Sequence, residues 1–147
     1  MLADDAGFND PSFVKTSAAL VDGLINRSSF AAGSAGSVSA VVNAKYKKKT
    51  GNDLDDPSAR AMQGLLIMAE AINRAGSTEP AKIQAALRAT DLKPNQIVTG
   101  YDGVKFDARG QNVLASSLIT QMQQGAYVPV WPKAKATAEV RLPYKGW

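Results

Sequence analysis

The sequence predicts an α/β fold that ends in a run of short strands, and three observations support this. The chain opens with an apolar strand end at Leu2 that runs into a loop. Helical patterns occupy most of 37–87. After Leu92, Gly, Pro, Asn and Asp interrupt short alternating segments, as in strands joined by turns. This order is unusual for a complete α/β domain, and the opening suggests a cut through a sheet.

Local signals place one short helix and one strand near the N-terminus. Asp10 is suited to cap a helix and Pro11 to be its first residue, so a short helix should begin there. Apolar and polar residues roughly alternate over 21–27, which predicts a strand. The small residues at 33–36 indicate a loop before the next helix.

Three helices are expected next, and their short connections make them neighbours in space. The first spans 37–50 and stops at Gly51, which suits a left-handed C-terminal position. The third follows a cap at Ser77 or Thr78. The first helix has an apolar face made of Val38, Val41 and Val42.

The second of these helices has the strongest pattern. Asp56 is predicted to cap it, Pro57 is its first helical residue, and Gly76 ends it. A single apolar stripe runs along it at a period of 3.6 residues, which predicts a buried face. The stripe consists of Met62, Leu65, Leu66, Ala69 and Ile72.

The C-terminal part should consist of short strands separated by turns that contain Gly, Asp and Asn. Within it, 115–122 alternates, with Ser116, Leu118, Thr120 and Met122 on one face. The predicted strands are 96–99, 104–106, 113–123 and 127–131.

Composition excludes several classes of function. The chain has no cysteine and no histidine. It therefore has no thiol nucleophile, no disulfide, no Cys/His zinc site and no imidazole acid or base. Phosphate-binding and dinucleotide-binding glycine motifs are absent from the sequence as well. We expect a protein that is not an enzyme, with no catalytic residues and no cofactor.

The charged residues are explained by helix ends and turns. The net charge is +4, and the densest basic run, 45–49, lies at a predicted helix C-terminus, where the helix dipole favours cations. A patch for a polyanion is the alternative, and we expect no nucleic-acid partner. The acids at 53–56 precede a helix, and Asp102 and Asp107 flank a turn. We therefore expect no metal site.

The loop at 4–8 is the most promising place for a binding site. It contains two carboxylates, a glycine and an aromatic residue directly after a strand. Ligands of open α/β sheets bind outside the carboxyl ends of the strands. A carboxylate here could hold an ammonium group while the aromatic ring packs against the ligand. An ordinary strand-to-helix loop is the alternative.

Several ordered segments resemble one family of transport proteins. The segments 69–78 and 102–112 carry the most specific likeness. Others are 4–15, 23–28, 44–51 and 127–132. Together they resemble the C-terminal part of the extracytoplasmic solute-binding proteins of ABC importers of the branched-chain amino-acid type. The resemblance implies an incomplete part of a two-lobed type I periplasmic-binding-protein fold with doubly wound sheets.

The resemblance also implies where a ligand would bind. In this family the ligand lies in a cleft between two lobes that close by a hinge motion. By this pattern Asp5 holds the ligand ammonium, while Ala6, Gly7 and Phe8 line the cleft. Ser58 and Arg60, at the start of the strongest helix, are expected to face the cleft too. The groups for the ligand carboxylate would belong to the first lobe, which this sequence lacks.

The resemblance divides the chain into four parts. Residues 1–20 would end a second-lobe segment, 21–30 would form a crossover strand, 31–112 a helical α/β segment, and 113–147 the C-terminal strands with a crossover and tail. Because one segment serves both lobes, helix faces and strand edges are left without partners. We therefore expect the chain to form a homo-oligomer.

The implied function is capture of an amino acid or a related small organic acid or amide for an importer. The expected partners are that ligand and the ABC permease. Met1 to Asp5 show no secretory leader, so the leader implied by a periplasmic location is expected in a missing N-terminal part. The alternative is the ligand-binding domain of a receptor or sensor with the same fold.

Overall fold

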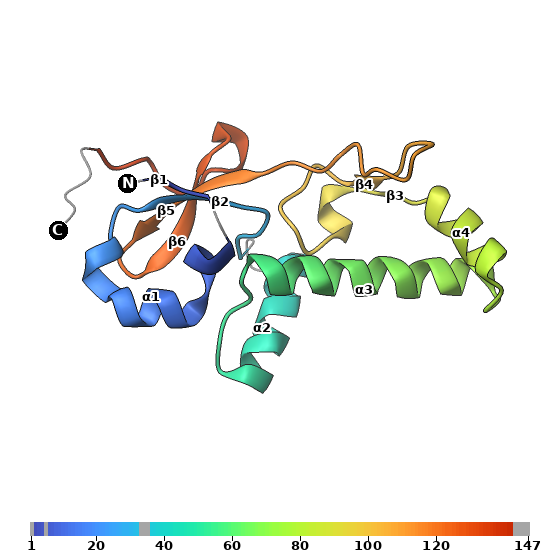
Figure 1. Cartoon of the computed structure of the whole chain (residues 1–147), viewed down its shortest axis with the longest axis horizontal. Helices are drawn as coiled ribbons and strands as arrows, with labels where there is room; N and C mark the ends of the chain where they lie inside the picture. The colour runs from blue at the N-terminus through green and yellow to red at the C-terminus, as the bar shows by residue number, and fades with distance from the viewer. Residues whose placement is uncertain (1, 5, 33–35, 143–147) are drawn as a thin grey trace.

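The computed structural model describes residues 2–4, 6–32 and 36–142. A four-stranded mixed sheet lies at one end of the molecule (Figure 1). Its strand order is β1-β2-β5-β6, with β1 parallel to β2 and the other neighbours antiparallel. The strands are β1 (Leu2–Ala3), β2 (Ile25–Ser28), β5 (Leu118–Gln123) and β6 (Ala126–Trp131).

A short helical layer covers one face of this sheet. It consists of η1 (Ala6–Asn9), α1 (Pro11–Ser17) and η2 (Ala18–Val21). Asp10 accepts a hydrogen bond from the Ser12 N–H at 2.7 Å, which confirms Asp10 and Pro11 as the start of α1. The core between the helices and the sheet is built on Val21, Leu24 and Met122.

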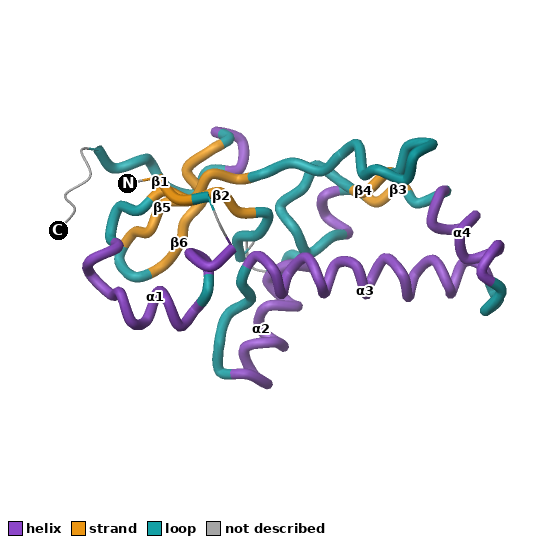
Figure 2. The backbone as a smooth tube through the Cα atoms, viewed as in Figure 1, coloured by secondary structure: helices purple, strands orange, loops and turns teal. Residues whose placement is uncertain are grey.

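The other helices extend away from the sheet. Figure 2 shows the four strands of the sheet gathered at one end and the long helix running to the other. These helices are α2 (Val38–Thr50), α3 (Asp56–Ala75) and α4 (Pro80–Arg88). A second core joins α2 and α3 to the segments that follow β2 and η3, and its buried members are Phe30, Leu54, Ala59 and Val98.

A small second sheet lies beside α3 (Figure 1). Its strands, β3 (Asp91–Leu92) and β4 (Val104–Lys105), are antiparallel. Two short helices complete the chain, η3 (Pro94–Gln96) and η4 (Lys133–Lys135). The α/β class predicted from the sequence is therefore confirmed.

The structure corrects three predicted strands. Gly23 has a positive φ of 86° and turns the chain after η2, so the strand expected at 21–27 starts only at Ile25. The segment 96–99 is no strand: Gln96 ends η3, and Gln63 of α3 accepts the Val98 N–H. The strand expected at 113–123 begins at Leu118, where pairing with β2 starts.

Helix boundaries are confirmed at their C-terminal glycines and corrected at two caps. Gly51 and Gly76 both have left-handed backbone conformations at the ends of α2 and α3. Asp56 is not the cap of α3, because Asp55 accepts the Ser58 N–H at 2.8 Å. Neither Ser77 nor Thr78 caps α4, which starts at Pro80 after Glu79.

Candidate ligand site at the loop after β1

The loop after β1 is held against β2 by polar contacts. The Asp4 carboxylate pairs with Arg27 of β2 at 2.7 Å, and this ion pair raises the pKa of the Arg27 guanidinium. Asn9 donates a side-chain hydrogen bond to the Arg27 carbonyl at 3.3 Å. Asp5, the residue predicted to hold an ammonium group, lies outside the described residues.

Phe8 has a structural position in the core under this loop. Its ring meets the Phe13 ring edge to face, with centroids 5.3 Å apart. Its carbonyl accepts a hydrogen bond from the Tyr127 hydroxyl at 2.9 Å. Burial raises the pKa of Tyr127 to about 12, so this hydroxyl remains a neutral donor at physiological pH. The Tyr127 hydrogen bond therefore ties the loop backbone to β6.

The first turns of α3 lie beside this loop. Figure 1 shows η1 next to the N-terminal end of α3, and their Cα atoms approach within 8 Å. The structure therefore brings together the two groups of predicted site residues, the loop from Ala6 to Phe8 and the helix start with Ser58 and Arg60. Their direct contact with a ligand remains a prediction.

A buried carboxylate organises this junction. Asp56 accepts hydrogen bonds from the backbone N–H and the hydroxyl of Ser29, which directly follows β2. Its other oxygen pairs with Arg60 at 2.8 Å. Ser28 lies at 3.4 Å from the same carboxylate and also donates to the Phe30 carbonyl. These bonds hold the end of β2 against α3.

A pocket of about 610 Å³ opens at the same junction. Its size falls within the range of about 300–1,000 Å³ that is usual for small-molecule sites. It is bordered by the loop after β1, the chain after β2, the α2–α3 connection and the β5–β6 turn. Its lining includes Asn9, Lys15, Ser28, Phe30, Asp53, Asp55, Asp56 and Tyr127.

The carboxylates of this pocket already have partners within the protein. Asp53 accepts hydrogen bonds from Lys47 and Asn43 at 2.8 and 2.9 Å, and the Lys47 bond is the main cause of its lowered pKa. Asp55 caps α3, and Asp56 binds Ser29 and Arg60. The pocket thus combines fixed negative charges with apolar walls such as Phe30.

Sequence reasoning missed several of these residues. Nothing in the pattern singled out Asn9, Ser28, Ser29 or Tyr127, which connect the loop, β2, α3 and β6. The only local signal was the small polar pair at 28–29 after a predicted strand. Their partners lie far away along the chain, so periodicity could not reveal them.

Comparisons with known proteins show what the chain is similar to. No family model matches the sequence. The chain is 37% identical over 99 residues to the Leu/Ile/Val-binding protein homolog 7 of Brucella suis, a match that covers 67% of this chain and 25% of that protein. The chain is a relative of the Leu/Ile/Val-binding proteins. It spans about a quarter of the length of the curated relatives it matches.

Solved structures show the same fold. The leucine-binding protein LivK of Thermotoga maritima superposes with a TM-score of 0.66 at 23% identity, over 86% of this chain and 35% of LivK. LivJ of Streptococcus pneumoniae, solved with isoleucine, gives a TM-score of 0.66 at 20% identity, over 86% of this chain and 34% of LivJ. The resemblance to branched-chain amino-acid binding proteins of ABC transporters is therefore confirmed, and the chain corresponds to part of their fold.

The described part of the chain offers neither a metal-binding cluster nor a membrane-spanning helix. Across residues 2–4, 6–32 and 36–142, acidic side chains do not gather in a group of three or more that could bind a metal ion. Within the same ranges, no helix has the length and apolar character needed to cross a bilayer.

Proposed function

We propose that this chain forms part of the solute-binding component of an ABC importer for amino acids or related small organic acids and amides. The observation that carries the proposal is the packing of the loop after β1 against the start of α3, beside the 610 Å³ pocket. The relatives are named as binding proteins, and the site offers hydrogen-bonding and charged groups. These observations support a role in binding, and the proposal places the chain outside the cytoplasm and in contact with a permease.

The chemistry of the loop favours an ammonium group as the feature that is recognised. Asp4 is engaged with Arg27, so Asp5 is the neighbouring carboxylate that this proposal assigns to the ligand. The 610 Å³ pocket is lined by three further acids, Asp53, Asp55 and Asp56, which raise the local negative potential. An α-amino acid supplies the cation, and apolar walls suit an aliphatic or aromatic side chain.

The test is calorimetry with leucine, isoleucine, valine and phenylalanine on two proteins. The 147-residue chain alone should give no tight binding, because functional pockets bury about 70–90% of a ligand and this proposal assigns part of the cleft to a further lobe. A longer protein that carries this chain and that lobe should bind at least one of these ligands. Micromolar binding by the chain alone, or none by the longer protein, would contradict the proposal.

A further inference from the structure

Gly64 occupies an unusual place in the middle of α3. A glycine inside a helix costs about 1 kcal/mol relative to alanine. Its φ is not positive, so the backbone does not require glycine there. A Cβ built on Gly64 would meet no heavy atom within 4 Å, so the neighbouring side chains do not require it either. Gly64 lines a hollow on the surface of the molecule.

This hollow lies between α3 and the segment around β4. Its volume is about 200 Å³. Ile67 of α3 lines it together with Val104 and Phe106, which gives it apolar walls. Gln63 fixes the wall, since its side-chain oxygen accepts the Val98 N–H at 2.5 Å. At roughly 30 Å³ per water-sized unit, the hollow has room for about six to eight non-hydrogen atoms.

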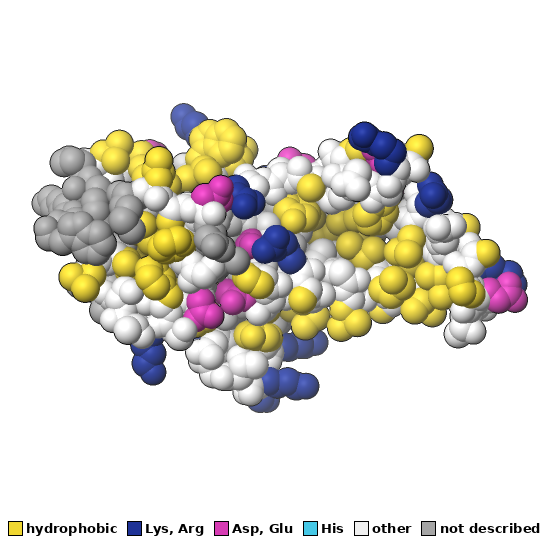
Figure 3. Space-filling model, viewed as in Figure 1, with side chains coloured by type: hydrophobic (Ala, Val, Ile, Leu, Met, Phe, Trp, Pro, Cys, Tyr) yellow, Lys and Arg dark blue, Asp and Glu magenta, His cyan; other side chains and the backbone are white. Residues whose placement is uncertain are grey.

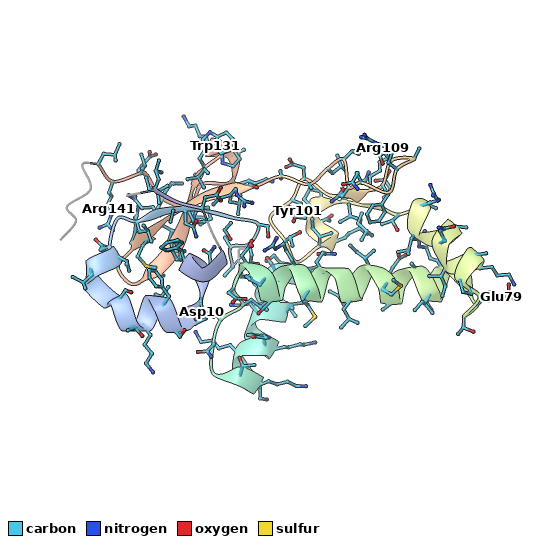
Figure 4. The ribbon with its side chains drawn as sticks, viewed as in Figure 1. Asp10, Glu79, Tyr101, Arg109, Trp131 and Arg141 are labelled. Atoms are coloured by element: carbon cyan, nitrogen blue, oxygen red, sulfur yellow. The ribbon has the colours of Figure 1, made fainter. Side chains whose placement is uncertain are left out.

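The edge of the hollow carries polar groups that are mainly hydrogen-bond donors. Arg60 lines it with a side chain that is 48% exposed, and its Nη2 pairs with Asp56 at 2.8 Å. A guanidinium has five N–H donors, so donors remain for a second carboxylate. Tyr101 also lines the hollow and lies above the first turns of α3 (Figure 4). The buried Thr99 hydroxyl there has no hydrogen-bond partner in the described structure.

We propose that this hollow binds a small aliphatic carboxylate. The hydrocarbon part packs against Ile67, Val104 and Phe106, and the carboxylate binds Arg60. This inference goes beyond the proposed function, because the hollow shares no lining residue with the 610 Å³ pocket. Every wall of the hollow belongs to this chain, so the 147-residue protein can test the inference by itself.

The first experiment compares two probes of equal shape by amide NMR titration of the 147-residue chain. Isovalerate should produce saturable shifts at Gly64, Ile67 and Val104. Isovaleramide lacks the charge and should bind several-fold more weakly. Arg60→Ala should weaken isovalerate binding about tenfold, as expected for loss of a charged hydrogen bond, and make the two probes equal. Arg109→Ala removes another arginine that is paired with an aspartate, and it should change neither affinity.

The second experiment fills the hollow while keeping the Arg60–Asp56 pair. Gly64→Leu should abolish binding of both probes and raise the thermal midpoint, because leucine is a good helix former. Ala61→Leu adds the same side chain to an exposed position outside the hollow and should preserve binding. Absence of saturable shifts in the unsubstituted chain, equal affinity for the two probes, or unchanged binding in Gly64→Leu would each overturn the inference. Gly64→Leu separates the two sites, because Gly64 lines the hollow and is not among the residues predicted for the amino-acid cleft, whereas Arg60 was predicted there as well.

Discussion

Asp56 shows how one side chain can serve two segments that are distant in the sequence. Its carboxylate reaches back to Ser29 at the end of β2 and forward to Arg60 within α3. Two adjacent aspartates stand at the start of the helix, and the sequence pattern predicted Asp56 rather than Asp55 as the cap. The structure assigns the cap to Asp55, because a contact with the end of β2 engages Asp56.

Asp56→Ala should destabilise the protein strongly. Removing the buried carboxylate leaves the buried Ser29 N–H without an acceptor, which costs about 1–3 kcal/mol, and the half-exposed Arg60 guanidinium without its partner. The measurement is the free energy of unfolding in urea. Asp91→Ala is the control, because Asp91 pairs with Lys93 and Lys105 at the exposed surface. Equal effects of the two substitutions would argue against a structural role for Asp56.

Asp5→Ala should weaken binding of an amino-acid ligand in the longer protein that the proposed function requires. Loss of a charged partner in a desolvated site costs about 2–5 kcal/mol, or roughly 30-fold to several-thousand-fold in affinity. Calorimetry with a ligand that has an amino group measures this loss. Binding of an analogue without the amino group should change far less. Unchanged affinity for the amino acid would remove Asp5 from the site.

Among the elements, helices were easier to predict than strands. The C-terminal glycines and the periodicity of α2 and α3 are local signals, so Gly51 and Gly76 were found correctly. A strand needs a neighbouring strand to pair with, and the segment 96–99 pairs with no strand of the two sheets. Its apolar residues Ile97 and Val98 are buried, with the Val98 N–H bound to Gln63 of α3. Alternation alone cannot report which surface will cover a segment.

Two glycines of the helical part should respond oppositely to alanine. Gly51 ends α2 with a φ of 79°, a left-handed conformation that costs an L-residue about 1–2 kcal/mol, so Gly51→Ala should destabilise. Gly64 is helical with open space around it, so Gly64→Ala should stabilise by about 0.5–1 kcal/mol. Urea unfolding of both variants measures the difference. A shift of the same sign in both would contradict this explanation.

The connection between α2 and α3 should be sensitive to acid. Lys47 and Asn43 of α2 hold the Asp53 carboxylate and lower its pKa. Because the folded state lowers this pKa, the Asp53 contacts stabilise the protein at pH values above the unfolded-state pKa of about 3.9. This stabilisation is lost as the pH falls through the folded-state pKa. Carboxyl NMR should show Asp53 titrating below that value.

Lys47→Ala tests the cause of this shift. It should move the titration midpoint of Asp53 upward, because the Lys47 hydrogen bond is the main contribution to the lowered pKa. Lys49→Ala removes an exposed lysine from the same last turn of α2 and should leave that midpoint in place. An unchanged midpoint in Lys47→Ala would show that another group holds the carboxylate.

For the molecule as a whole, the most informative feature is an apolar helix face that stays in contact with solvent. The sequence predicted a stripe on α3, and periodicity predicted its burial. In the structure Leu65 is 63% exposed, and Leu66 and Ile72 are each 39% exposed. Figure 3 shows hydrophobic side chains in a band along this part of the molecule. The predicted burial of the stripe is therefore wrong for these three residues, because no described segment packs over this part of α3.

We predict that the 147-residue chain, if it folds alone, does so as a dimer or higher oligomer. Each few hundred Å² of apolar surface left in water forfeits several kcal/mol at about 25 cal/mol per Å², a large share of the roughly 5–15 kcal/mol that stabilises a domain. Pairing of two α3 faces, or exchange of the segment 127–147 between chains, would recover part of this energy. Light scattering at tens of micromolar measures the mass.

Leu65→Lys together with Leu66→Lys should shift this equilibrium to monomer if the α3 face is the contact. Charged side chains at the centre of an apolar interface would have to be desolvated without partners, which disfavours association. Val113→Lys, at an exposed apolar residue outside the helices, is the matched control and should leave the oligomer intact. A stable monomer of the unsubstituted chain with cooperative unfolding would mean that its helices need no further surface. An oligomer that survives the double substitution would instead favour exchange of the C-terminal segment.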